Sequence, residues 1–199
     1  HKLIMTSAAY MQSSLEDAAR RKLDPDNQWH WRRTPRRLEA EAIRDSMLAV
    51  SGQLDTTMYG PGTLNSNMKR RSVYFFIKRS KLISMMMLFD WPEHLVSIGR
   101  RANTTIAPQA LMFMNSTQGR QYSLAFAGQL PEQRASAIEQ AYQLALARDP
   151  SAAESELAAK FIAQQQASYE RAGRKDGSQL ARRDFCQALL SSNEFVYLD

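Results

Sequence analysis

Apolar residues recur at helical spacing along most of the chain, and the clearest case is the segment 34–55. One face of this segment carries Ala40, Ile43, Met47 and Val50. Thr34 suits the N-cap, Pro35 the first helical position and Gly52 the residue just past the helix end. The pattern predicts an amphipathic helix that starts at Thr34 and buries one face in a core.

The second half of the chain has the pattern of consecutive helices. Pro108 opens one apolar segment, residues 116–130 form a second, and Pro131 restarts the pattern. Ser151 with Glu154 predicts a capping box at the start of another helix. The last helix should bury Ala181, Phe185, Ala188 and Leu189. Because the turns between these segments are short, we expect neighbouring helices to pack against each other.

One stretch favours β-structure. Residues 72–77 (SVYFFI) are rich in β-branched and aromatic residues, and a second apolar run covers residues 84–89. The two runs predict a small β hairpin over about Ser72–Phe89. The preceding segment, residues 56–71, has no period and predicts a long loop. The expected fold class is mainly α: an irregular multi-helix domain with one small hairpin, forming a single domain over residues 1–199.

Positive charge is concentrated in the first half of the chain. The net charge is +6; residues 1–101 hold 17 Lys/Arg against 10 Asp/Glu (+7), and residues 102–199 hold 9 against 10 (−1). The candidate polyanion-binding residues are Lys69, Arg70, Arg71, Lys78, Arg79, Arg100 and Arg101. An anionic polysaccharide is one partner that such a surface would fit. Nucleic acid is a poorer candidate, because no nucleic-acid-binding motif accompanies the charge.

The predicted Thr34 helix carries a dense group of ionisable residues. Its members are Arg37, Glu39, Glu41, Arg44 and Asp45. Glu41 and Asp45 lie four residues apart and would repel each other unless an arginine intervenes. We expect Arg37 and Arg44 to pair with Glu41. The group is either a structural ion-pair network or half of a functional site.

No catalytic or metal-binding motif is present in the sequence. The three histidines (His1, His30 and His94) are widely spaced, and Cys186 is the only cysteine. We therefore expect no bound metal or haem, no catalytic residue, and a buried, unreactive Cys186. The chain has no glycine-rich phosphate loop and no Gly-x-Ser-x-Gly elbow. No apolar run approaches the length of a membrane span.

Several ordered motifs resemble one family. In order they read HKLIMTSAAYMQSS, DPDNQWHWRRTPRRLEAEAIRDSMLAVSGQLD, RRSVYFFIKRS, LFDWP followed by RRANTTIAPQAL, and CQALLSSNEFVYLD. The series resembles the planctomycete domain of unknown function at the C-terminal end of large exported proteins. Members often carry Cys where this chain has Ile98 or Gly99. The resemblance implies an extracytoplasmic multidomain parent with an upstream cytochrome c-type domain that holds haem, and it implies no reaction.

The family's domain usually begins before the position equivalent to His1, so the resemblance implies an N-terminally incomplete C-terminal module. The leading expectation is an interaction or scaffold module that binds other domains of the same parent. The alternative is a domain that binds or processes a polyanion or polysaccharide through the basic first half. An enzymatic role is not predicted from the residues.

Overall fold

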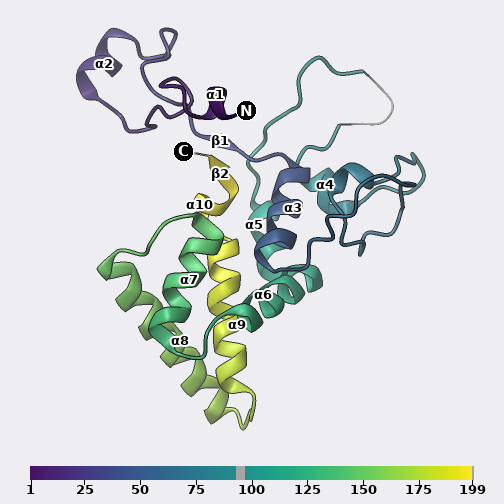
Figure 1. Cartoon of the computed structure of the whole chain (residues 1–199), viewed down its shortest axis with the longest axis vertical. Helices are drawn as coiled ribbons and strands as arrows, with labels where there is room; N and C mark the ends of the chain where they lie inside the picture. The colour runs from purple at the N-terminus through teal and green to yellow at the C-terminus, as the bar shows by residue number, and fades with distance from the viewer. Residues whose placement is uncertain (93–96, 199) are drawn as a thin grey trace. The chain divides into compact units, whose positions relative to one another are not determined.

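Helices dominate the computed structural model, which describes residues 1–92 and 97–198 (Figure 1). This confirms the mainly α fold class. The chain divides into two units, each with its own internal contacts. The first comprises His1–Arg37 with the end of the chain from Tyr197, and the second comprises Leu38–Val196. The expectation of a single domain over residues 1–199 stays a prediction.

The first unit contains short elements. They are α1 (Lys2–Met5), α2 (Ala18–Leu23), β1 (Arg36–Arg37) and β2 (Tyr197–Leu198). The two strands pair antiparallel, with Arg36 opposite Leu198 and Arg37 opposite Tyr197. Asp17 caps α2, because its carboxylate accepts the backbone N–H groups of Ala19 and Arg20.

The turn after α2 is organised by one buried carboxylate. Asp24 accepts the backbone N–H groups of Gln28 and Trp29 at 2.9 and 2.8 Å. The indole N–H of Trp31 donates to the Asp24 carbonyl at 3.0 Å. These bonds close the turn after α2 and fix the path of the chain beyond it.

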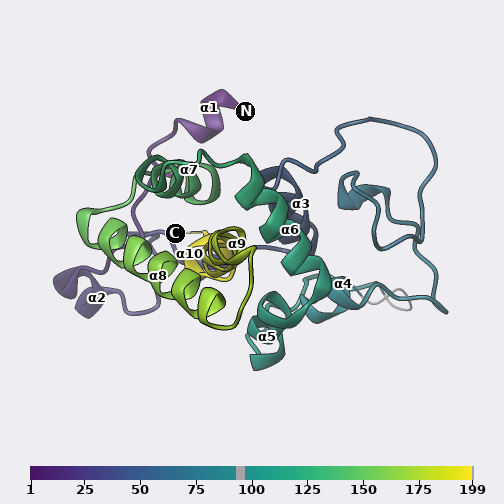
Figure 2. The same cartoon turned by 90° about the horizontal axis from the view of Figure 1, so that it is seen from below.

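The second unit contains the larger helices. They are α3 (Ala40–Val50), a 3-10 helix (Ser72–Tyr74), α4 (Ser84–Leu88), α5 (Ala107–Asn115), α6 (Thr117–Gln129), α7 (Arg134–Leu146), α8 (Ala152–Arg171), α9 (Gly177–Leu190) and α10 (Asn193–Val196). Helix α9 is central: it packs against α6 on one side and α8 on the other, and α7 covers α8 (Figure 2). Helix α3 contacts α4, α6 and the 3-10 helix.

The core of the second unit follows this packing. Fully buried apolar side chains include Ile43, Leu48, Met86, Phe126, Ala141, Ala181 and Leu190. Phe89 and Phe113 stack at a tilt with ring centroids 5.4 Å apart, which joins the end of α4 to α5. The periodic apolar positions predicted for the last helix are confirmed at Ala181, Phe185 and Leu189, which are all buried, whereas the prediction for Ala188 is wrong because that residue is exposed.

The predicted start of the 34–55 helix is wrong, although its end is confirmed. Helix α3 begins at Ala40, because Arg36 and Arg37 are extended in β1 and the Leu38 N–H donates to Val196. At the other end Gly52 has φ +66°, and the Gln53 N–H donates to the Leu48 carbonyl at 2.9 Å. This left-handed glycine and the bond behind it form a Schellman motif.

The predicted hairpin over about Ser72–Phe89 is also wrong. Residues 72–74 form the 3-10 helix, and residues 84–88 form α4. Methionine and leucine have high helix propensity, so the Met-rich run forms a helix instead of a strand. Within the described residues, the first run forms one isolated β-bridge, between Phe75 and Thr63.

The predicted helix boundaries of the second half are confirmed where local capping sets them. Ser151 accepts the Glu154 N–H, and the Glu154 carboxylate accepts the Ser151 N–H, which forms the capping box of α8. Pro108 lies in the first turn of α5. Helix α6 covers residues 117–129, with Ser116 as its N-cap.

Candidate functional site

The predicted charge cluster centres on a buried arginine. Arg44 on α3 is 2% exposed, and burial lowers the pKa of its guanidinium. Its Nη1 donates to the Arg70 carbonyl at 3.0 Å and to Ser72 Oγ at 3.1 Å, and its Nη2 donates to the Met68 carbonyl. The guanidinium also lies 4.6 Å from the centre of the Phe75 ring. Arg44 therefore fastens the segment 68–75 onto α3.

Asp45 completes this attachment from the next position on α3. Its carboxylate accepts the Ser72 N–H at 2.8 Å and the Ser72 hydroxyl at 2.6 Å. It also lies 3.4 Å from Arg44 and 3.6 Å from Arg71. Because one carboxylate receives both donors of Ser72, the chain turns into the 3-10 helix at that residue.

A second arginine organises the long loop before it. Arg70 donates to the carbonyl oxygens of Thr57, Tyr59 and Pro61, and its guanidinium lies 3.5 Å from the centre of the Tyr74 ring. The Tyr74 hydroxyl in turn accepts the Tyr59 N–H at 2.7 Å. The segment 56–71 was predicted as a loop without periodicity. The guanidinium of Arg70 holds this loop together through its hydrogen bonds to three carbonyl oxygens.

The remaining carboxylates of the cluster meet a partner from far along the chain. Glu41 accepts two hydrogen bonds of 2.8 Å from Arg101, and Glu39 accepts one of 3.1 Å. Partial burial alone would raise the pKa of Glu41, but the hydrogen bonds and the positive charge of Arg101, together with other hydrogen bonds to the carboxylate, lower the pKa on balance. Since Arg44 donates elsewhere, the predicted pairing of Glu41 with Arg44 is wrong. Arg37 lies in β1, in the other unit, where it is buried.

The seven candidate polyanion-binding residues fall into two groups. Arg70, Arg71 and Arg101 make the internal contacts described above, although Arg71 keeps 66% of its side chain exposed. The other four, Lys69, Lys78, Arg79 and Arg100, are exposed to solvent. At least three of the seven candidates therefore take part in contacts within the chain.

The residues with metal or thiol chemistry are also placed. Within residues 1–92 and 97–198, no three His, Cys, Asp or Glu side chains come together as a metal site. His94 lies outside the described residues. Cys186 is fully buried on α9, and burial raises the pKa of its thiol to about 12, as expected for an unreactive core cysteine. None of the helices in the described ranges is long and apolar enough to cross a membrane.

A charge network at the α7–α8 junction was not predicted from the sequence. Arg148 donates to Glu154 at 2.7 and 3.0 Å and to Glu194 at 2.6 and 2.8 Å. Its hydrogen bonds lower the pKa of Glu154 to about 2, and those to Glu194 raise the pKa of Arg148. The capping box marks Glu154 in the sequence, but no local signal links Arg148 to Glu194, 46 residues away.

We expect Arg148→Met to change the pH dependence of folding stability. The folded-state pKa of Glu154 is depressed from 4.5 to about 2, so its contribution is present above about pH 4.5 and is lost as the pH falls towards 2. The variant lacks the main cause of the depression, so its stability should fall less across that window. Urea unfolding at pH 6, 4 and 3 checks this. Parallel stability curves for the variant and the wild type would contradict it.

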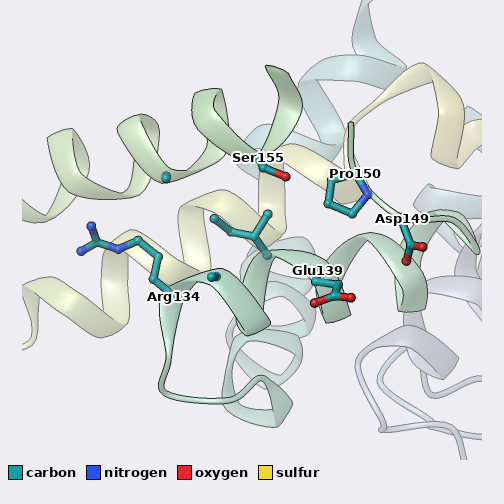
Figure 3. A pocket seen from close by; sticks show the side chains of 8 residues that line it. Arg134, Glu139, Asp149, Pro150 and Ser155 are labelled. Carbon is teal, nitrogen blue, oxygen red and sulfur yellow. The ribbon is translucent and has the colours of Figure 1, made fainter. Parts of the chain in front are cut away.

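A cleft of about 550 Å³ lies beside the same junction (Figure 3). It is lined by Arg134, Ala135, Ile138, Glu139, Asp149, Pro150, Ser155 and Ala159. Figure 3 shows Arg134 towards one end, with Glu139 and Asp149 towards the other. All three charged side chains are exposed. The cleft offers polar contacts of both signs over an apolar floor, without a desolvated acid, base or nucleophile.

One comparison with known proteins identifies a family. A family model described as a protein of unknown function (PSD1, DUF1553) matches residues 1–162. Neither a curated protein nor a solved structure matches the chain significantly. Because the matched residues cover most of the 199 residues, the chain belongs to the DUF1553 (PSD1) family of proteins of unknown function.

Proposed function

We propose that this chain is an interaction module whose first unit docks onto another domain of the same multidomain protein. The observation that carries the proposal is the exposure of apolar side chains in residues 1–37. No apolar side chain of this segment is buried. Its exposed large apolar residues are Leu3, Ile4, Met5, Tyr10, Met11, Leu15, Leu23 and Trp29.

The exposure is too extensive to be ordinary surface. Leu3 is 85% exposed, Leu15 81% and Trp29 77%. Burying one such side chain contributes about 1.5–3 kcal/mol, so leaving eight in water forgoes a large stabilisation. A short segment with this many large exposed apolar side chains is typical of an interaction site. A docking partner would supply the core that the first unit lacks.

The charge of the first unit defines the partner further. Residues 1–37 hold eight Lys/Arg and four Asp/Glu, a net charge of +4. Three of the cations, Arg20, Arg21 and Lys22, are adjacent on α2 and exposed. A complementary surface would be apolar at its centre with acidic residues at its rim, because rim charges steer association. The exported parent and its upstream haem domain are part of this proposal and are supported by the sequence resemblance.

Binding between the chain and the separately produced remainder of its parent tests the proposal. We expect the double variant Leu23→Ser with Trp29→Ser to bind at least tenfold more weakly in isothermal titration calorimetry, because it loses two apolar contacts. A matched control changes Leu144 and Leu157 to serine; both are exposed, on α7 and α8 of the second unit. Equal affinities for the two double variants would contradict the proposed docking surface.

A second candidate function is polyanion binding, and one observation favours it. Residues 56–89 contain six Lys/Arg and no Asp or Glu. Five of them are exposed: Arg71, which approaches Asp45, and the four cations Lys69, Lys78, Arg79 and Lys81. Retention on a heparin column at low salt, with loss of retention on replacing these four by glutamine, would support this candidate.

A further inference from the structure

The exposed loop Phe76–Leu82 is held at both ends by buried side chains. Phe75 and Ile83 flank it and are each 7% exposed, while every residue from 76 to 82 is exposed. The Phe76 N–H donates to the Thr63 carbonyl at 2.9 Å at the start of the loop. A loop anchored in this way is presented to solvent from a fixed base, which reduces the entropy lost on binding.

Apolar and positively charged residues occupy different parts of this loop. The apolar residues Phe76, Ile77 and Leu82 lie next to the anchors and are 57%, 55% and 48% exposed. The cations Lys78, Arg79 and Lys81 surround the turn at the tip, where the Lys81 N–H donates to the Lys78 carbonyl at 3.0 Å. None of the three cations forms an ion pair with any residue in the described ranges.

We propose that the loop Phe76–Leu82 is a second docking element, which inserts its three cations into an acidic cleft on a protein partner. The apolar residues at its base would then pack on the apolar rim of that cleft. This inference rests on the proposed function, because the partner is another domain of the same parent. The loop belongs to the second unit of the chain, so the partner must provide a second binding site for it.

The order of residues in the loop distinguishes a protein cleft from other anionic partners. A soluble polyanion would pair with the cations but has no use for three exposed apolar side chains. A lipid surface takes apolar side chains at the depth of insertion, whereas here the cations occupy the tip. A cleft with acidic walls and an apolar rim matches both the cations and the apolar residues of the loop. Residues 56–89 contain no Asp or Glu, so no carboxylate of this segment would repel the acidic walls of the cleft.

Two triple variants of the full chain test the loop against the remainder of the parent. In the first, Lys78, Arg79 and Lys81 are changed to glutamine; in the second, Phe76, Ile77 and Leu82 are changed to serine. We expect the charge variant to lose at least tenfold in affinity at 50 mM salt and much less at 500 mM salt. The apolar variant should lose at least tenfold at both. A control that changes Arg120, Lys160 and Lys175 to glutamine removes the same charge from exposed positions elsewhere.

The outcomes separate the two proposals. Wild-type affinity in both loop variants, with weakened binding by the Leu23 and Trp29 variant, would overturn the loop proposal and leave the docking function intact. Equal losses in the charge variant and its charge control would also overturn it, because general attraction would explain both. Loop-dependent binding to heparin or to phosphatidylglycerol vesicles, with unchanged binding to the parent's remainder, would assign the loop to a different partner and contradict the proposal.

Discussion

Replacing Arg44 by methionine should destabilise the second unit by about 3–5 kcal/mol, because it removes one partner from a buried charged network. Arg44 is 2% exposed and donates to the carbonyl oxygens of Met68 and Arg70 as well as to Ser72. Methionine keeps the apolar stem but leaves the two carbonyl oxygens without this donor and removes the positive charge beside Asp45, which keeps its hydrogen bonds from Ser72. Urea unfolding followed by circular dichroism measures the change, and faster proteolysis within residues 56–71 should accompany it.

Arg71→Met is the matched control for this variant. Arg71 approaches the same Asp45 carboxylate at 3.6 Å, but its side chain is 66% exposed. Solvent screens such a pair, so its loss should cost less than about 1 kcal/mol. Equal free energies of unfolding for the two variants would mean that Arg44 does not anchor the loop.

We expect Phe126→Ala to have an effect of similar size for an apolar reason. Phe126 is fully buried on α6, which packs on the central helix α9. Removing its ring deletes buried apolar surface and opens a cavity, which costs about 3–5 kcal/mol. Leu124 lies on the same helix and is 41% exposed, so Leu124→Ala should cost less than about 1.5 kcal/mol. Thermal and urea unfolding of both variants compares them, and a Phe126→Ala midpoint equal to that of Leu124→Ala would contradict this packing.

The sequence predicts the parts of the fold that local chemistry decides. The Ser151–Glu154 capping box, the proline in the first turn of α5 and the left-handed Gly52 after α3 are each set by residues within one turn of the chain. For the same reason, the helical pattern of the second half and the mainly α class are confirmed.

Long-range contacts explain where the sequence interpretation fails. The segment 34–39 has good helix-start signals, yet Arg36 and Arg37 pair with residues 197 and 198, which no local pattern reveals. The SVYFFI run favours a strand, but Asp45 captures both donors of Ser72 and turns the chain there. In both cases tertiary contacts override local preference.

The candidate site shows the same limit. The sequence locates the dense charges on α3 but pairs them within the helix, whereas Arg101 binds Glu41 across 60 residues. Because Arg101 keeps about a third of its side chain exposed, the loss of Glu41 should cost only about 1 kcal/mol. The true buried network consists of Arg44, Asp45 and Ser72.

The contacts of the arginines reduce the number of cations in residues 1–101 that are free to bind a partner. Arg70, a polyanion-binding candidate in the sequence, instead holds the loop 56–75 together, and Arg44 anchors the same loop on α3. The exposed apolar side chains of residues 1–37 and the anchored loop Phe76–Leu82 remain directed to solvent. Both features are consistent with the proposed docking onto another protein surface.

Hydroxyl-radical footprinting tests the central claim, that the first unit is a docking surface, most directly. The side chains of Met5, Met11 and Trp29 react readily with the radical and are 55%, 70% and 77% exposed in this chain. If the first unit is a docking surface, we expect strong labelling of all three side chains in the isolated chain and at least fivefold slower labelling in the intact parent protein. The exposed Leu157 on α8 serves as the internal reference. Equal labelling rates of these three residues in the chain and in the parent would contradict the account.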